Sequence, residues 1–299
     1  MIGLIGTVGL IGLIAISSRP IPAVPAARIS AGSAARPADS IRNASGAQPG
    51  QSRRPAPDRA DTLRRIGTKA FAAGEYLSFD VNYLGVTAGE ANLKVSDTLL
   101  FGRKCFSVEF RLRSKPFFDM FYRVEDRYTT VIDAEGLFPW HFEQHIREGG
   151  FTKDFAADFD QVNHVAKTTE GTHPIPAYVQ DMLSALYYSR SVDYGSFKEG
   201  QKMHLQNFYK DSTYELDVRF RGRQTIEVES GKFNCVVIEP LAHEGGLFRS
   251  EGKLYVWLTD DERRLPVRVS TRIAIGSVDS ELLRYRGING PIDSRIQEQ

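Results

Sequence analysis

Cysteine is scarce in this sequence: Cys105 and Cys235 are the only two. No spacing among Cys and His residues resembles the ligand pattern of a structural zinc site, so the sequence does not support a zinc-organised fold. In an oxidising compartment the two thiols can pair, and their 130-residue separation would close a long loop. Two unrelated buried thiols fit the sequence at least as well, because both cysteines fall in segments expected to be strands.

An excess of charge of either sign is also absent. The chain carries 38 Lys and Arg against 37 Asp and Glu, for a net charge of +1. Nucleic-acid-binding domains present a basic face or stripe, which a near-neutral chain does not suggest. We therefore predict no nucleic-acid partner.

Recognisable catalytic motifs are missing as well. The sequence contains no phosphate-cradling glycine loop and no nucleophile elbow. Spacing alone singles out no Ser–His–Asp or Cys–His arrangement. We predict a protein that is not an enzyme, with no catalytic residues and no cofactor. A hydrolase or metal-dependent enzyme is the weaker alternative.

No apolar run is long enough to span a membrane comfortably, since a spanning helix needs roughly 20 residues. The apolar run at 2–16 fits the core of a secretory signal, with a small-residue cleavage site at Val24-Pro25-Ala26. No Lys or Arg precedes this run, and its glycines are poor helix formers. We expect 1–26 to be a signal peptide or a short apolar anchor. The predicted location is the periplasm of a Gram-negative-type bacterium, with membrane association only through an uncleaved amino terminus; a disordered cytosolic tail is the alternative.

Residues 27–62 are rich in Pro, Ala, Ser and Arg and nearly lack large apolar side chains. Such a segment cannot bury enough surface to offset the entropy of ordering it, so we expect a disordered linker. The remaining chain is predicted to form a single β-rich domain at 63–288, followed by a flexible tail at 289–299.

Alternation of apolar and polar residues dominates the predicted domain. In the segment from Glu75 to Leu84, Leu77, Phe79 and Val81 share one face. About a dozen such segments follow one another, separated by turns rich in Gly, Asp and Asn. So many twisted antiparallel strands must curl. The predicted fold is mainly β: a curled antiparallel sheet, as a half-barrel or unclosed barrel.

One segment has helical periodicity instead. Apolar residues recur at helical spacing between Ile175 and Arg190, and Pro176 marks the entry. We predict one principal helix at about 177–190, packed on the concave face with a cleft between helix and sheet. Asp181 is expected to favour the helix amino terminus; a general acid or base in the cleft is the less favoured reading.

Two histidines and a carboxylate share one face of an expected strand. His141, Glu143 and His145 alternate with Trp140 and Phe142, which marks the histidine face as solvent-exposed. Same-face neighbours on one strand lie about 7 Å apart, so three ligands rarely converge on one ion. We predict a solvated polar face and no metal site.

Three stretches together resemble a known family: Gly74 to Glu90, the helical Gln180-Asp181 with Ser184 to Tyr188, and Leu254 to Asp261 with Leu265-Pro266-Val267. The chain resembles the bacterial "domain of unknown function 3108" (DUF3108) proteins, which are exported envelope proteins. That family has no settled activity. The resemblance implies a fold similar in style to periplasmic lipoprotein carriers, which hold acyl chains in an unclosed barrel beneath a helical lid.

This fold predicts a protein that binds a lipid or other apolar ligand in the concave face of the sheet. Aromatic residues before the helix and apolar residues on it are the candidate ligand-binding side chains; in the alternative reading they are simply core. They are Phe117, Phe118, Phe121, Tyr122, Val179, Met182, Leu183, Leu186 and Tyr187. A scaffold that engages another envelope protein is the alternative function.

Overall fold

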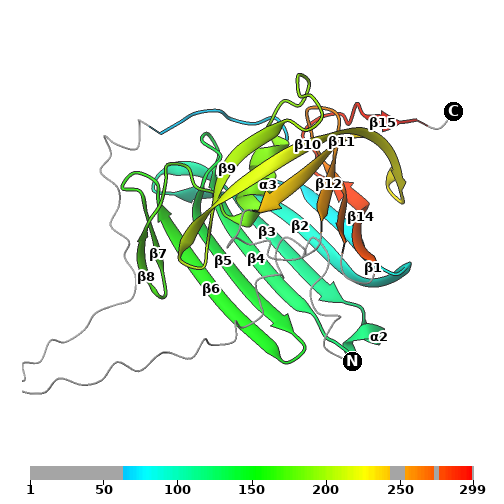
Figure 1. Cartoon of the computed structure of the whole chain (residues 1–299), viewed down its shortest axis with the longest axis horizontal. Helices are drawn as coiled ribbons and strands as arrows, with labels where there is room; N and C mark the ends of the chain where they lie inside the picture. Colours follow the sequence, from blue (N-terminus) through cyan, green and yellow to red (C-terminus); the bar gives the residue numbers. More distant parts are fainter. Residues whose placement is uncertain (1–62, 243–252, 273–275, 298–299) are drawn as a thin grey trace, which may run out of the picture.

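The computed structural model describes residues 63–242, 253–272 and 276–297. They form one large antiparallel sheet that curls around a helix without closing into a barrel (Figure 1). The predicted fold class is confirmed. The expected signal peptide or anchor at 1–26 and the linker at 27–62 lie outside the described residues. No helix of the described part is long and apolar enough to cross a membrane.

The first half of the sheet is a meander of eight strands joined by short turns. They are β1 (Tyr76–Tyr83), β2 (Val86–Leu100), β3 (Arg103–Ser114), β4 (Glu125–Asp133), β5 (Pro139–Glu148), β6 (Phe151–Asp160), β7 (Val165–Thr168) and β8 (Gly171–Pro174). A single helical turn, α2 (Pro116–Asp119), interrupts the β3–β4 connection.

The second half follows the longer helix α3 (Met182–Arg190). Its strands are β9 (Lys202–Tyr209), β10 (Ser212–Val228), β11 (Gly231–Ala242), β12 (Leu254–Thr259), β13 (Pro266–Arg272), β14 (Ser277–Arg286) and β15 (Arg295–Ile296). The last of these falls in the segment predicted to be a flexible tail. Within that segment, residues 295–296 pair with Lys232 and Phe233 of β11.

The two halves join through β1 and β14, so the order across the sheet runs from β8 back to β1, then from β14 back to β9. The edge strands β8 and β9 share no ladder. Side chains bridge this seam instead: Thr168 donates a hydrogen bond to Asp211 at 2.6 Å, and His173 lies 3.3 Å from the same carboxylate. The main chain of Gln180 also pairs with Asn207 of β9. The curl is therefore held together across its opening without strand pairing.

Helix α3 lies inside the curl (Figure 1) and begins later than the sequence predicts. Asp181 is its N-cap: the carboxylate accepts hydrogen bonds from the main-chain N–H groups of Leu183 and Ser184. Tyr178 has a positive φ of 60°, and Gln180 bonds to β9. The apolar spacing extends the pattern back to Val179, but these two main-chain constraints exclude helix before Asp181.

The helix divides the interior into two ends. The turns β2–β3, β4–β5 and β12–β13 lie around α3, and we call this the α3 end. The turns β1–β2, β3–β4 with α2, and β5–β6 lie at the opposite, α2 end. One continuous apolar core, formed by the inward side chains of the strands and one face of α3, joins the two.

Candidate functional site

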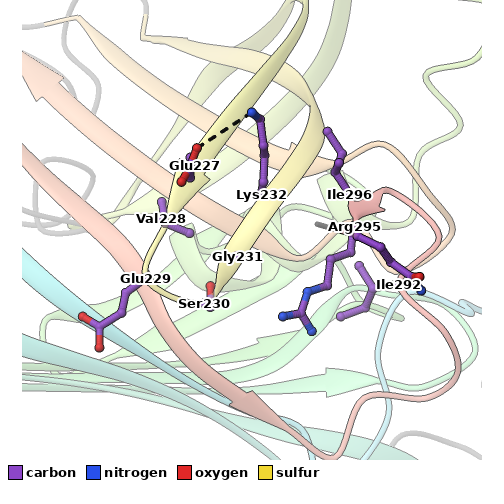
Figure 2. A pocket seen from close by; sticks show the side chains of 10 residues that line it. Glu227, Val228, Glu229, Ser230, Gly231, Lys232, Ile292, Arg295 and Ile296 are labelled. Carbon is purple, nitrogen blue, oxygen red and sulfur yellow. Dashed lines mark ion pairs between the residues drawn. The ribbon is translucent and has the colours of Figure 1, made fainter. Parts of the chain in front are cut away.

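A solvent-open hollow of about 660 Å³ lies between the β10–β11 turn and the carboxyl-terminal segment. Figure 2 shows Arg295 reaching toward the hairpin turn, and Glu227 and Lys232 paired at 3.8 Å across the hairpin. Four of its ten lining residues are charged, and none is predicted to bind ligand. The predicted ligand-binding residues lie elsewhere in the structure.

The predicted ligand-binding residues near and on α3 are all packed inside. Val179, Met182, Leu183, Leu186 and Tyr187 are between 0 and 8 % exposed and belong to the main core. Helix and sheet meet through these side chains, which fill the α3 end of the curl. Their ligand-binding role stays a prediction.

The predicted aromatic residues before β4 take a different position. Phe117 and Phe121 are exposed on α2 and just after it, and Phe118 is half-buried. The Tyr122 ring instead lies against Gly149 in the β5–β6 turn, where a Cβ would be 2.8 Å from the ring. Only Tyr122 of this group lies beside buried polar groups of the interior.

Those polar groups form a cluster on β4 and β5 that the sequence analysis missed: Asp126, Tyr128, Gln144 and Glu148. Thr130, two residues beyond Tyr128, donates a hydrogen bond to Asp181 at the start of α3, so this face of β4 points into the curl. Tyr128 pairs directly with Gln144 in the β4–β5 ladder. All four residues are buried, at the α2 end below the helix.

Tyr128 and Gln144 are fully buried, yet their polar atoms are unpaired. The Tyr128 hydroxyl and both amide atoms of Gln144 have no hydrogen-bond partner among the described residues. An unsatisfied buried polar group costs about 1–3 kcal/mol, so three such atoms side by side are unusual in a structural core.

Asp126 and Glu148 form a buried carboxyl pair next to them. Burial raises the pKa of Asp126 to about 6, although the main-chain N–H of Arg147 donates a hydrogen bond to this carboxylate at 2.9 Å. Burial, and then the charge of Asp126, raise the pKa of Glu148 to about 8. At neutral pH Glu148 therefore holds a proton, and its neutral carboxyl can donate a hydrogen bond.

Next to the cluster, β6 and β9 add aromatic rings and one lysine. Phe155 pairs with Gln144 and Phe151 with Glu148 in the β5–β6 ladder, and both phenyl rings are only partly buried. Between them Lys153 donates a hydrogen bond to the Tyr209 hydroxyl at 2.8 Å, across the seam. Burial lowers the pKa of Lys153 to about 8. The α2 end of the interior thus combines aromatic surface with two carboxyl groups whose pKa values are raised and a lysine whose pKa is lowered.

The histidine face of β5 points to the outside. His141 lies 2.7 Å from Asp158 and His145 lies 2.9 Å from Asp154, both on β6. Within the described ranges, no group of three or more His, Cys, Asp or Glu side chains is arranged to hold a metal ion. Cys105 and Cys235 are separate buried thiols. Burial raises the pKa of each to about 12, which suppresses thiolate chemistry.

Comparison with protein families decides the relationship suggested by the three sequence stretches. Residues 78–283 match the family described as "Protein of unknown function (DUF3108)". The chain belongs to the DUF3108 family. The matched range includes β4, β5 and all four residues of the polar cluster. No curated protein matches the chain.

Three solved structures resemble this DUF3108 chain, each over 75 % of its length and 99 % of their own. The first is a β-barrel-like protein of the DUF1849 family from Brucella abortus, with 12 % identity and a TM-score of 0.48. The second, from Bacteroides fragilis, is described as exported with a YmcC-like fold; its identity is 11 % and its TM-score is 0.32. The third, from Parabacteroides distasonis, is described as a lipoprotein; its identity is 9 % and its TM-score is 0.34. At these values the likeness says nothing about function.

Proposed function

We propose that this protein is a non-enzymatic protein of the periplasmic envelope that binds an amphiphilic lipid in the concave face of its sheet, between α3 and the α2 end. Export is supported by the apolar run at 2–16 and its small-residue cleavage site in the sequence. The binding site rests on the interior described above.

The observation that carries the proposal is the unpaired state of Tyr128 and Gln144. Both side chains are 0 % exposed, directly opposite each other, and without a partner for three polar atoms in the described part of the chain. A ligand with a hydroxyl, carbonyl or phosphate group can satisfy these atoms. The lipid's polar group is the part we assign to this cluster.

The surroundings suit an apolar chain. Phe151 and Phe155 of β6 and Tyr83 of β1 pack against the core but keep part of their surface free. Ligand sites in proteins are mostly apolar surfaces with a few convergent polar groups, and this arrangement has that character. A bound acyl chain would cover these rings.

A scaffold function has one observation in its favour. The side chains of α3 are packed against the sheet, so the α3 end of the interior is filled. In that function the protein holds no lipid and uses its outer surface to engage another envelope protein.

Native mass spectrometry of the full chain, purified under mild conditions, separates the two functions. We expect adducts of lipid mass on the wild-type protein. Tyr128→Phe and Gln144→Leu remove the unpaired atoms while conserving most of the volume, and each should lower adduct occupancy. Glu143→Gln changes the neighbouring, outward-facing position of β5 and is the matched control.

Two outcomes would contradict lipid binding. A bare polypeptide mass for the wild type would favour the scaffold. Adducts that persist unchanged in the Tyr128→Phe, Gln144→Leu double variant would show that the lipid binds elsewhere.

A further inference from the structure

The largest exposed apolar side chains of the described residues gather at one place. Phe117, Met120 and Phe121 are 64, 71 and 74 % exposed. They belong to α2 and the two residues after it, at the far end of the β3–β4 hairpin, where α2 projects from the sheet (Figure 1). Solvent-exposed aromatic clusters are uncommon in soluble proteins and mark contact surfaces.

The turn that carries these side chains is held by internal hydrogen bonds and ring contacts. The main-chain N–H of Phe121 donates to the Phe118 carbonyl at 2.9 Å, and the hydroxyl of Ser114 bonds to Asp119. The Phe117 ring packs edge-on against Phe118 and Phe121, with centroids 5.4 and 5.8 Å away. The rings are held as one projecting group, so a partner would lose little entropy in fixing them.

The neighbouring turn extends the apolar surface. Leu84 and Val86 of the β1–β2 turn are 63 and 55 % exposed. This turn is adjacent to α2, because the main-chain N–H of Lys115 bonds to the Ala88 carbonyl at 2.9 Å. Among the described residues, five of the eight exposed large apolar side chains therefore lie at the α2 end: Leu84, Val86, Phe117, Met120 and Phe121. We call these five residues the apolar tip.

Basic side chains flank the tip. The segment from Arg113 to Arg123 carries three cations and one carboxylate, a net charge of +2. Arg113 and Arg123 both pair with Glu125, so one carboxylate is shared between two guanidinium groups that remain 65 and 67 % exposed. Lys115 is 3.9 Å from Glu90. Asp119, Glu125 and Glu90 balance the three cations in number, but the Arg113 and Arg123 side chains stay exposed beside the apolar tip.

We propose that the apolar tip is a membrane-docking surface, which inserts Phe117, Met120 and Phe121 into the interfacial layer of a lipid bilayer. Aromatic side chains favour that layer, and Arg113, Lys115 and Arg123 are placed to meet lipid phosphates. A bilayer accepts projecting rings without a complementary pocket, which suits a convex tip. Membrane contact then does not depend on the amino terminus, contrary to the expectation from sequence.

This surface is independent of the interior site. It can dock whether or not the concave face holds a lipid, because its side chains are exposed whereas the polar cluster is buried. Tyr122 follows the tip directly and lies between the two regions, since its ring contacts Gly149 and senses the charges of Glu148 and Asp126.

A fluorescent probe on the tip tests the docking directly in the full chain. Met120→Cys is labelled with an environment-sensitive nitrobenzoxadiazole dye; the native Cys105 and Cys235 are buried and do not compete. With vesicles of phosphatidylcholine and phosphatidylglycerol, we expect a blue shift and quenching by bromine-labelled lipids. Leu99→Cys, at a position that is 71 % exposed at the opposite end of the sheet, is the matched control. A dye at this position should show neither the blue shift nor the quenching.

Two further variants separate the contributions. Phe117→Ser with Phe121→Ser, in the Met120→Cys background, should weaken tip insertion by about tenfold for each ring lost. Lys115→Glu with Arg123→Glu should weaken it by roughly fivefold per charge, and only on anionic vesicles.

The proposal is overturned if the dye at position 120 reports water on vesicles that carry bound protein, or if positions 99 and 120 respond alike. Self-association through the tip, seen as a dimer that Phe117→Ser with Phe121→Ser dissolves while vesicles leave the dye unchanged, would overturn it in favour of a second copy. Loss of lipid adducts in the Gln144→Leu variant, with the dye response intact, separates this surface from the interior site.

Discussion

Arg190 and Glu75 form an ion pair that is completely buried between the last turn of α3 and the residue before β1. The guanidinium Nη1 and Nη2 atoms lie 2.6 and 2.7 Å from the two carboxylate oxygens. Remaining donors reach the carbonyls of Ala70, Arg263 and Arg264. The pair ties the carboxyl end of the helix to the first strand and to the β12–β13 turn, which are far apart in sequence.

Removing one partner of this pair should destabilise the fold strongly. Arg190→Met leaves the Glu75 carboxylate buried and unpaired, and we expect a loss of about 3–5 kcal/mol in the free energy of unfolding. Chemical denaturation measures it. Arg268→Met, which breaks the part-exposed pair with Glu281, is the control and should cost under about 1 kcal/mol. Equal losses in the two variants would contradict the role assigned to Arg190.

The N-cap of α3 makes a second prediction. Asp181 accepts hydrogen bonds from Leu183 and Ser184 N–H groups and from the Thr130 hydroxyl at 2.6 Å. Asp181→Ala removes all three, so thermal and chemical unfolding should show a loss of about 2–4 kcal/mol. Asp181→Asn retains an acceptor and should cost less. Asp193→Ala, which removes an exposed turn carboxylate bonded to Gly195, should be nearly neutral.

The carboxyl pair makes stability depend on pH. The pKa values of Asp126 and Glu148 are raised in the folded state, to about 6 and about 8, above their ordinary values near 4. The folded protein therefore binds more protons than the unfolded chain between about pH 4 and 8, and its stability falls as pH rises through this window.

Denaturation midpoints measured from pH 4.5 to 8.5 check this dependence. One proton linked to folding gives a slope of at most about 1.4 kcal/mol per pH unit. Glu148→Gln removes the titrating group and should flatten the profile, whereas Glu170→Gln, at an exposed carboxylate in the β7–β8 turn, should leave it unchanged. A wild-type profile that rises from pH 5 to 8 would mean that the pair is not protonated in the folded state.

Gln144 provides a prediction that sets binding against stability. Its amide has no partner within the described residues, so Gln144→Leu removes an uncompensated polar group and should leave unfolding free energy unchanged or raise it by about 1 kcal/mol. The same variant is expected to lose lipid adducts. A loss of more than about 2 kcal/mol would instead indicate that the amide has a structural partner.

The two cysteines should be inert until the protein unfolds. Cys105 and Cys235 are 1 and 0 % exposed, and burial raises both pKa values to about 12. A thiol reagent should label neither residue in the native protein and both in denaturant without reductant. Absence of labelling after unfolding would show that the two residues pair as a disulfide.

Alternation in the sequence is enough to predict the curled sheet, because most inward residues of the strands, such as Leu77 and Phe79, are apolar. The start of α3 is not predictable in this way. Val179 continues the helical spacing, but the positive φ of Tyr178 and the pairing of Gln180 with β9 are set by the tertiary structure. Local spacing carries no information about that strand.

The polar cluster could have been found from one signal in the sequence. Trp140, Phe142 and Ile146 mark the inward face of β5, and Gln144 and Glu148 occupy the same alternate positions. The alternation alone therefore places two polar residues on an apolar face. Their proximity to Asp126 and Tyr128, and the lack of partners, depend on the β4–β5 register, which the alternation does not determine.

The pairing of β1 with β14 has a consequence for folding. Consecutive strands of each meander are joined directly, whereas Tyr76 must meet Arg286 across most of the domain, a larger separation than that of the β11–β15 pair. Closing so large a loop is slow on entropic grounds. We expect the two meanders to gain amide protection first and the β1–β14 ladder last in pulsed hydrogen exchange during refolding. Until that step, both unpaired edges are open to other chains, so the period of greatest aggregation risk lies just before the halves join.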